Sequence, residues 1–145
     1  MSVSQNGWVV LESESECMTR SIAGFIIPLA PGTAGRVLAE FARKFHREVE
    51  PLNAVRDDWG WSYRRIGGSS EWSNHASGTA LDLNSLRHPQ GDRDTFRPGQ
   101  LLRLRTLLAA YPVIKWGGDY RSTVDEMHFE LAVSRTVLLT WVRSR

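Results

Sequence analysis

The strongest constraint on the fold is one long amphipathic stretch, residues 34–50. Its apolar side chains recur every three or four residues, with charged residues between them: Val37, Leu38, Phe41, Phe45 and Val49. This spacing predicts a helix with one buried face, and Pro51 ends it because proline cannot continue a helix. A buried helical face needs a partner, so the rest of the chain must supply a sheet or further helices.

The other periodic segments are short and do not alternate regularly between helix and strand. Further helices are expected at residues 98–111 and 134–142. Strands are expected at 57–66, 79–84, 112–116 and 127–131, and short strands or extended arms at 8–11 and 25–27. This order of elements predicts an α+β fold, with a small antiparallel sheet flanked by helices.

Length and charge narrow the class of protein. A chain of 145 residues suits one domain, so we expect a single unit over 1–145 with a motif-bearing core at about 57–131. The net charge is only +2 and the arginines are scattered, which does not predict a nucleic-acid partner. The longest apolar run, 107–114, is shorter than the roughly 20 residues of a membrane span.

The N-terminal sequence shows no secretory signal, and Cys17 has no partner for an intramolecular disulfide. We therefore expect a monomer that is made in the cytoplasm and has no stable membrane association.

Two segments carry most of the chemically versatile side chains: residues 73–82 (SNHASGTALD) and 125–130 (DEMHFE). They offer two imidazoles, His75 and His128, and the carboxylate of Asp82 on an expected strand. Nitrogen and oxygen donors of this kind suit a catalytic zinc site, in which a fourth position stays open for water. Zinc lowers the pKa of such a water to about 7, so that a hydroxide nucleophile forms at neutral pH.

The same segments resemble the signatures of a known enzyme family. The run SNHASGTALDL is similar to the S-x-H-x-x-G-x-A-x-D signature of the M15 metallopeptidases, the D-alanyl-D-alanine carboxypeptidase and L-alanyl-D-glutamate endopeptidase group. WGGDY and DEMHFEL resemble that family's W-G-G-D and D-x-x-H-F-E-L segments, and WSYRRIGGSS resembles the segment that brings its substrate arginine. These four motifs follow the family's order from about Trp59 to Leu131.

The resemblance implies the M15 fold, which hedgehog-type signalling domains share, and a zinc peptidase acting on the peptidoglycan stem peptide. It implies these roles: zinc ligands His75, Asp82 and His128, general base Asp125, and substrate-binding residues Arg64 and Ser73. Asp125 would deprotonate the zinc-bound water and later protonate the leaving amine. As in phage endolysins, the protein would act on the cell wall after release, from the host cytoplasm if phage-encoded.

The residues themselves leave two assignments open. On a strand, Glu126 and Glu130 share a face with His128, so Glu126 competes with Asp125 unless Asp125 lies in the turn before the strand. Arg65 competes with Arg64, although its parity places it on the aromatic face of the expected strand.

For the remaining candidate residues, structural roles are expected. His46 is expected to be exposed on its helix, His88 to be solvated in a loop, and Asp119 to lie in a turn or orient a ligand imidazole. We expect most of the candidate tryptophans to be buried rather than stacked on a glycan: Trp59, Trp61, Trp72 and Trp116. Cys17 is too isolated to be a nucleophile.

Two other classes of protein fit the same residues. One is a non-catalytic zinc-binding module of the same fold, against which the acid at Asp125 argues. The other is a metal-free, Trp-rich protein that binds the cell wall. For a peptidase, carboxypeptidase and endopeptidase cleavage both remain open, because the shape of the pocket decides between them.

Overall fold

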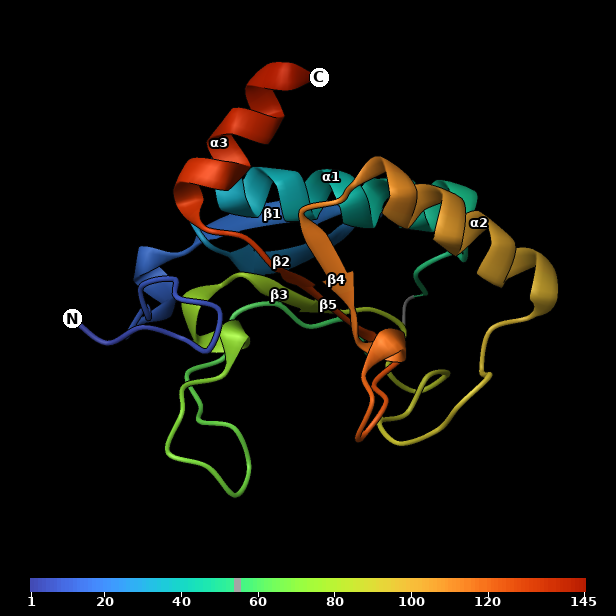
Figure 1. Cartoon of the computed structure of the whole chain (residues 1–145), viewed down its shortest axis with the longest axis horizontal. Helices are drawn as coiled ribbons and strands as arrows, with labels where there is room; N and C mark the ends of the chain where they lie inside the picture. Colours follow the sequence, from blue (N-terminus) through green and yellow to red (C-terminus); the bar gives the residue numbers. More distant parts are fainter. Residues whose placement is uncertain (54–55) are drawn as a thin grey trace.

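The computed structural model describes residues 1–53 and 56–145 and confirms the α+β arrangement. The helices are α1 (Thr33–Glu48), α2 (Pro98–Ala110) and α3 (Arg135–Ser144), with 3-10 turns η1 (Glu14–Glu16), η2 (Asn74–Ser77) and η3 (Gly117–Asp119). The strands are β1 (Met18–Ile22), β2 (Phe25–Leu29), β3 (Ala80–Asp82), β4 (Ile114–Trp116) and β5 (His128–Leu131). β1 and β2 form a hairpin, and an antiparallel sheet has the order β3-β5-β4. In Figure 1, α1 and α2 run above the strands and the long loops hang below them.

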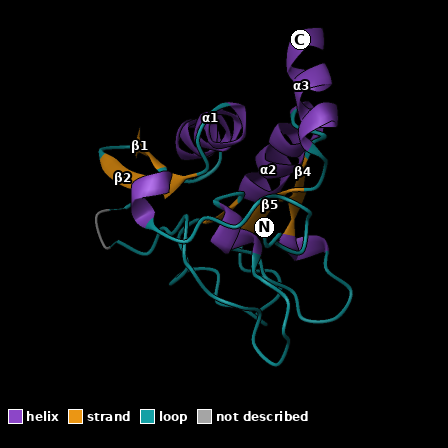
Figure 2. Cartoon of the chain, turned by 90° about the vertical axis from the view of Figure 1, so that its left-hand side faces the viewer, coloured by secondary structure: helices purple, strands orange, loops and turns teal. Residues whose placement is uncertain are grey.

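The amphipathic helix α1 lies at the centre of the core. Its apolar face is fully buried, and the Phe41 ring lies 5.1 Å from that of Phe129 on β5 and 5.4 Å from that of Tyr111, just after α2. Figure 2 shows α1 beside the β1–β2 hairpin, with α2, β4 and β5 on its other side. One helical face therefore joins the hairpin to the three-stranded sheet. None of the helices in the described part of the chain has the length and apolar character that a membrane crossing requires.

The β1–β2 hairpin depends on a two-residue turn. Ala23 and Gly24 both have positive φ, 53° and 86°, and Ile22 pairs directly with Phe25. Positive φ at both central residues is the geometry of the tight turns that match the twist of paired strands. The strand expected at 25–27 therefore continues to Leu29, whereas the segment 8–11 forms only an isolated bridge, between Val9 and Val3.

The three-stranded sheet has one apolar and one polar face. Along β5, Phe129 and Leu131 are fully buried, while His128 and Glu130 alternate with them and point to the other face. Asp82, the last residue of β3, is the direct cross-strand partner of His128. Side chains of directly paired residues lie on the same face, so the sheet register brings these two together.

The segment 57–66 is not a strand, which corrects the sequence prediction. Its backbone is extended, but its hydrogen bonds go to different neighbours in turn: Trp59 to Asp82, Trp61 to Pro28, Ser62 to His75 and Arg64 to Ser73. A strand needs a continuous ladder with one partner, and this segment has none. Its aromatic side chains have different surroundings: Trp61 donates to the carbonyls of Leu11 and Ala76, Tyr63 stacks on Trp72, and Trp59 is 56% exposed.

His88 is buried, so the prediction of a solvated loop residue is wrong. Its Nε2 lies 2.8 Å from Glu50 Oε1, its Nδ1 lies 2.7 Å from Thr95 Oγ1, and its ring stacks on Phe96. Asn84 donates a further hydrogen bond to Glu50. This buried polar cluster ties the loop after β3 to the C-terminal end of α1.

His46 is only partly buried, and it too has a structural contact. Its Nδ1 accepts a hydrogen bond of 2.9 Å from the backbone N–H of Leu52. The imidazole thereby holds the chain where it turns away from α1 at Pro51.

Candidate metal centre

Three side chains from three separate elements converge on one point. They are His75 in η2, Asp82 at the end of β3 and His128 at the start of β5. His75 Nε2 lies 3.2 Å from Asp82 Oδ2, and His128 Nδ1 lies 3.1 Å from Asp82 Oδ1. One potential ligand atom from each residue lies within 4.8 Å of the other two. The structure therefore brings together all three residues that the resemblance named as ligands.

Local backbone geometry explains the motif around His75. Ser73 caps η2, because its hydroxyl accepts a hydrogen bond from the N–H of His75. Gly78 ends the turn with φ of +68°, and a Cβ there would lie 2.4 Å from the backbone nitrogen of Ala30. Only glycine fits this close approach. Because Gly78 has no side chain, the turn that carries His75 can pack against the chain after β2.

The His75 ring is oriented by the backbone carbonyl of Gly60. Nδ1 lies 2.7 Å from that oxygen and donates a proton to it, which leaves the lone pair on Nε2. Nε2 is buried and makes no hydrogen bond with any described residue. A metal ligand needs a nitrogen with a free lone pair. A buried nitrogen that is left without any partner lowers the stability of the fold.

The His128 ring is oriented by Glu130. Nε2 lies 2.9 Å from Glu130 Oε1, while Nδ1 faces Asp82. Glu130 is itself held by a hydrogen bond of 2.8 Å from Asn74 and by another from the Tyr120 hydroxyl. Burial lowers the pKa of His128, but the hydrogen bonds to Asp82 and Glu130 outweigh it and raise the pKa to about 9. The position therefore favours positive charge, which a metal ion on Nδ1 would supply in place of the proton.

The donor set fits a zinc ion. Burial raises the pKa of Asp82, but its interactions with His128 and His75 outweigh burial and hold the pKa far below its usual range. Asp82 is thus an ionised oxygen donor between two imidazoles. The set offers two imidazole nitrogens and one carboxylate. The other nitrogen of each ring is hydrogen-bonded, to a carbonyl for His75 and to a carboxylate for His128. Both features match the ligands and supporting contacts of catalytic zinc sites.

Glu130 was assigned no role from the sequence, although strand parity placed it beside His128. We expect Glu130→Gln to lower zinc affinity by about 10–100-fold, because an amide supports the His128 N–H less well than a carboxylate. Competition with a chromogenic chelator measures the affinity. Arg121→Ala is a matched control, since Arg121 lines the same cavity and no hydrogen bond or ion pair joins it to either imidazole within the described chain. An unchanged affinity in Glu130→Gln would contradict the positioning role.

Asp125 lies beside the cluster, in the turn before β5. Its N–H donates to the Gly117 carbonyl, and a Cβ on Gly117 would lie 2.3 Å from the Asp125 carbonyl oxygen. The W-G-G-D glycine therefore allows the Asp125 turn to pack closely. Burial raises the pKa of Asp125, and its Oδ1 has no hydrogen-bond partner within the described chain. A free, basic carboxylate thus lines the same cavity as both imidazoles.

Glu126 points elsewhere. Its carboxylate accepts hydrogen bonds from the backbone N–H groups of Asp94 and Thr95 and from the Thr95 hydroxyl. The parity argument for Glu126 does not apply, because β5 begins only at His128 and the chain before it is a turn. Asp125, not Glu126, is the carboxylate placed at the cluster.

A cavity of about 780 Å³ opens over the cluster. It is lined by His75, His128, Asp125 and Ser73, and by three cationic side chains, Arg64, Lys115 and Arg121. The Ser73 hydroxyl lines it while capping η2, so both roles considered for this residue are compatible with its position. The carboxylates of Asp119, Asp125 and Glu130 also line it, so the cluster opens into a cavity of mixed charge.

Arg64 and Arg65 point to different environments. Arg65 stacks on the Trp72 ring at 4.0 Å and donates to the Ser70 carbonyl. The exposed Arg64 lines the cavity, and its guanidinium makes no hydrogen bond or ion pair with the residues that the structure describes. Arg64 is the arginine available to a substrate.

Asp119 does not orient a ligand imidazole. It forms a bidentate pair with Arg105, with both N–O distances 2.7 Å, in the turn at η3. Of the four tryptophans, Trp116 is buried and Trp61 and Trp72 are partly buried, but Trp59 is 56% exposed. Burial raises the pKa of the Cys17 thiol to about 11, which disfavours the nucleophilic thiolate.

This α+β domain combines a His–Asp–His cluster that could hold a metal ion with a free carboxylate in one cavity, an arrangement suited to hydrolysis. A comparison with family models supports this interpretation: the model described as D-alanyl-D-alanine carboxypeptidase, of the M15 peptidases, matches residues 67–131. That segment includes Ser73, the three cluster residues and Asp125. Over this segment the chain is similar to the M15 peptidases, as the motifs indicated. Comparisons with curated proteins and with solved structures gave no match.

Proposed function

We propose that the protein is a zinc-dependent peptidase that hydrolyses an amide bond of the peptidoglycan stem peptide. The observation that carries the proposal is the open cavity in which the His75, Asp82 and His128 cluster lies beside the unpaired carboxylate of Asp125. The family match supports a hydrolase acting on peptides. The free carboxylate favours catalysis over a non-catalytic zinc-binding module of the same fold.

His75 Nε2, Asp82 and His128 Nδ1 would hold the zinc, which when bound supplies a Lewis acid for water and for the scissile carbonyl. Asp125 takes the proton of the attacking water at its unpartnered Oδ1 and returns it to the leaving amine. Its raised pKa suits the first of these steps, because a more basic carboxylate accepts the proton more readily. Gly60 and Glu130 keep the two imidazoles in the tautomers that leave their inner nitrogens free.

The cavity offers cationic groups to an acidic peptide, beside the carboxylates of Asp119, Asp125 and Glu130. Arg64, Lys115 and Arg121 line it, and Arg64 is free to form a bidentate pair with a substrate carboxylate. A stem peptide carries free carboxylates on both D-glutamate and terminal D-alanine. Cleavage between L-alanine and D-glutamate and removal of terminal D-alanine are both compatible with these cations. We propose that the protein acts as a monomer on the cell wall after its release from the cytoplasm.

The proposal is tested with defined muropeptides. The purified protein is incubated with zinc and with muropeptides ending in either one or two D-alanines, and the products are identified by mass spectrometry. We expect cleavage that a chelator abolishes and added zinc restores. The product masses distinguish the carboxypeptidase from the endopeptidase reaction. Cleavage that resists the chelator, or no cleavage when zinc is present, would overturn the proposal.

A further inference from the structure

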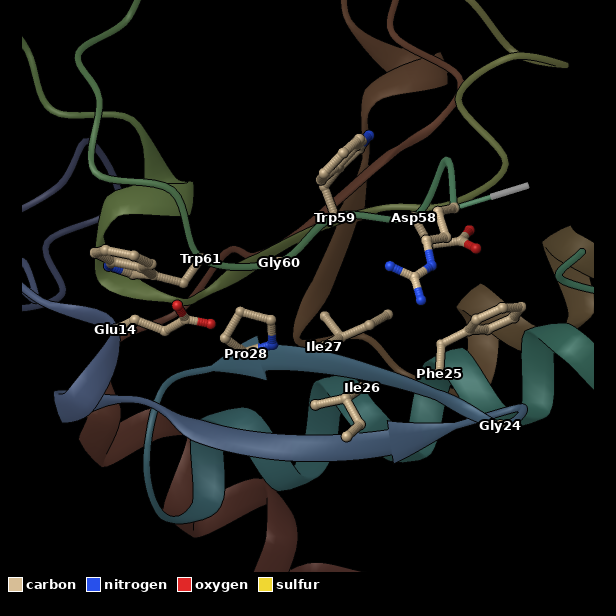
Figure 3. Close-up of a pocket in the computed structure, with 11 residues that line it drawn as sticks. Glu14, Gly24, Phe25, Ile26, Ile27, Pro28, Asp58, Trp59, Gly60 and Trp61 are labelled. Carbon is tan, nitrogen blue, oxygen red and sulfur yellow. The ribbon is translucent and has the colours of Figure 1, made fainter. Parts of the chain in front are cut away.

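A second cavity, of about 640 Å³, is lined by β2 and the neighbouring segment 58–61. In Figure 3, Gly60, Pro28 and Ile27 lie in its middle, Glu14 and Trp61 at one end, and Phe25 and Asp58 at the other. Of the described residues, none lines both this groove and the metal cavity. The groove, which we call the aromatic groove, has no role in the mechanism above.

The backbone of the aromatic groove is firmly held. Trp59 exchanges two backbone hydrogen bonds with Asp82, of 2.8 and 2.9 Å, and Trp61 donates one of 2.7 Å to Pro28. Gly60 is in close contact with β2, since a Cβ there would lie 2.2 Å from the Pro28 carbonyl oxygen. The side chains of this segment therefore project from a fixed platform.

Apolar side chains on that platform are unusually open to solvent. Trp59 is 56% exposed and the Phe25 ring is partly exposed, whereas Ile26, 72% exposed, projects from the face of β2 turned away from residues 58–61 (Figure 3). Large apolar groups exposed together around a concave surface are typical of binding sites rather than of a free surface. The Trp61 indole is fixed in place, because its Nε1 donates to the carbonyls of Leu11 and Ala76.

Two carboxylates, Asp58 and Glu14, and the guanidinium of Arg56 supply the charged part of the aromatic groove. Asp58 Oδ1 accepts a hydrogen bond of 2.8 Å from the N–H of Asn84, but no described residue bonds to its buried Oδ2. Glu14 lies at the other end of the groove (Figure 3). Carboxylate oxygens accept hydrogen bonds from hydroxyl and amide N–H groups. A fitting ligand thus has an apolar face and several such donors.

We propose that the aromatic groove binds the glycan strand of peptidoglycan, a polymer of N-acetylated hexosamines. A pyranose ring presents an apolar C–H face, which stacks on an aromatic ring, and an edge of hydroxyl and acetamido N–H donors for Asp58 and Glu14. The inference rests on the proposed function in one respect: a stem peptide is covalently attached to a glycan, so a substrate in the metal cavity brings sugar with it.

The aromatic groove and the metal centre share one segment of chain. The Gly60 carbonyl orients His75, and the Trp59 backbone pairs with Asp82, while the side chain of Trp59 borders the groove. Glycan bound in the aromatic groove would therefore be separated from His75 and Asp82 by a single extended segment of backbone. This placement suits an enzyme that binds the sugar polymer while it hydrolyses the attached peptide.

The test compares Trp59→Ala with a matched control, Trp72→Ala, which removes a partly buried tryptophan outside both cavities. Isothermal titration with β-1,4-linked N-acetylglucosamine oligomers measures binding. We expect Trp59→Ala to weaken binding about tenfold, as the loss of one aromatic stacking contact would, and Trp72→Ala to leave it unchanged. Stoichiometric zinc in both variants verifies that they fold.

Two substrates separate this inference from the proposed function. Trp59→Ala should cleave a soluble stem peptide at the wild-type rate but a glycan-linked peptide more slowly. If the wild type binds the oligomer through Trp59 but cleaves no peptide, the glycan assignment is supported and the proposed function is wrong. Absent oligomer binding by the wild type, equal binding by Trp59→Ala, or capture of apolar peptides instead of sugar would each overturn the glycan assignment.

Discussion

Asp125→Asn should lower the rate of peptide hydrolysis by roughly 10²–10⁴-fold, the usual contribution of a general base. Asparagine has the same shape as aspartate but cannot accept a proton at neutral pH. The backbone hydrogen bond from residue 125 to Gly117 does not depend on the side chain, so the turn should persist. Steady-state rates on a defined muropeptide measure the effect, and metal analysis should find one zinc per chain, as in the wild type.

The control for this variant is Glu126→Gln. Glu126 is the neighbouring carboxylate, but it is bound to the backbone at Asp94 and Thr95 and does not line the metal cavity. Its rate should stay within a few fold of the wild type. A near-normal rate for Asp125→Asn together with a large loss for Glu126→Gln would move the base to the residue that strand parity favoured.

His75→Ala should abolish stoichiometric zinc binding and, with it, hydrolysis. The variant leaves two ligands where a catalytic zinc site uses three. It also breaks the hydrogen bond of the buried ring to the Gly60 carbonyl and leaves a cavity, so we expect the metal-free chain to lose some stability. Zinc content after dialysis, measured by mass spectrometry of the metal, checks the first expectation, and chemical denaturation of the metal-free protein checks the second.

His46→Ala is the matched control for metal binding. His46 is a partly buried histidine on α1 whose Nδ1 holds the N–H of Leu52, and it lies outside the cluster. This variant should keep one zinc per chain. Retention of stoichiometric zinc by His75→Ala would show that the metal is held elsewhere, and the proposed mechanism would then lose its basis.

Regular periodicity determined much of the fold from the sequence alone. The spacing of apolar residues in 34–50 predicted α1 to within two residues at its ends, and the second and third helices followed from the same pattern. Alternation along 127–131 correctly placed His128 and Glu130 opposite Phe129. These features are local. They follow from the 3.6-residue period of a helix and the two-residue period of a strand, which the spacing of apolar residues within one segment reveals.

Three features of the molecule depend on the tertiary structure and could not be predicted from the sequence. The alternating segment 57–66 is not a strand, because its hydrogen bonds are distributed among β2, β3 and the turn around His75. Asp125 rather than Glu126 lines the cavity, because the close contact of Gly117 sets where the turn ends and β5 begins. His88 is buried because Glu50, 38 residues earlier, supplies its partner.

Sequence motifs named the residues of the metal centre, but their orientation came from contacts that no motif contains. The lone pair of His75 is directed inward by a carbonyl at Gly60, and that of His128 by Glu130, which Asn74 and Tyr120 hold in turn. A sequence specifies which donors a chain possesses. Where each lone pair points is decided only when distant segments pack together, because a hydrogen bond depends on distance and angle in space rather than on separation along the chain.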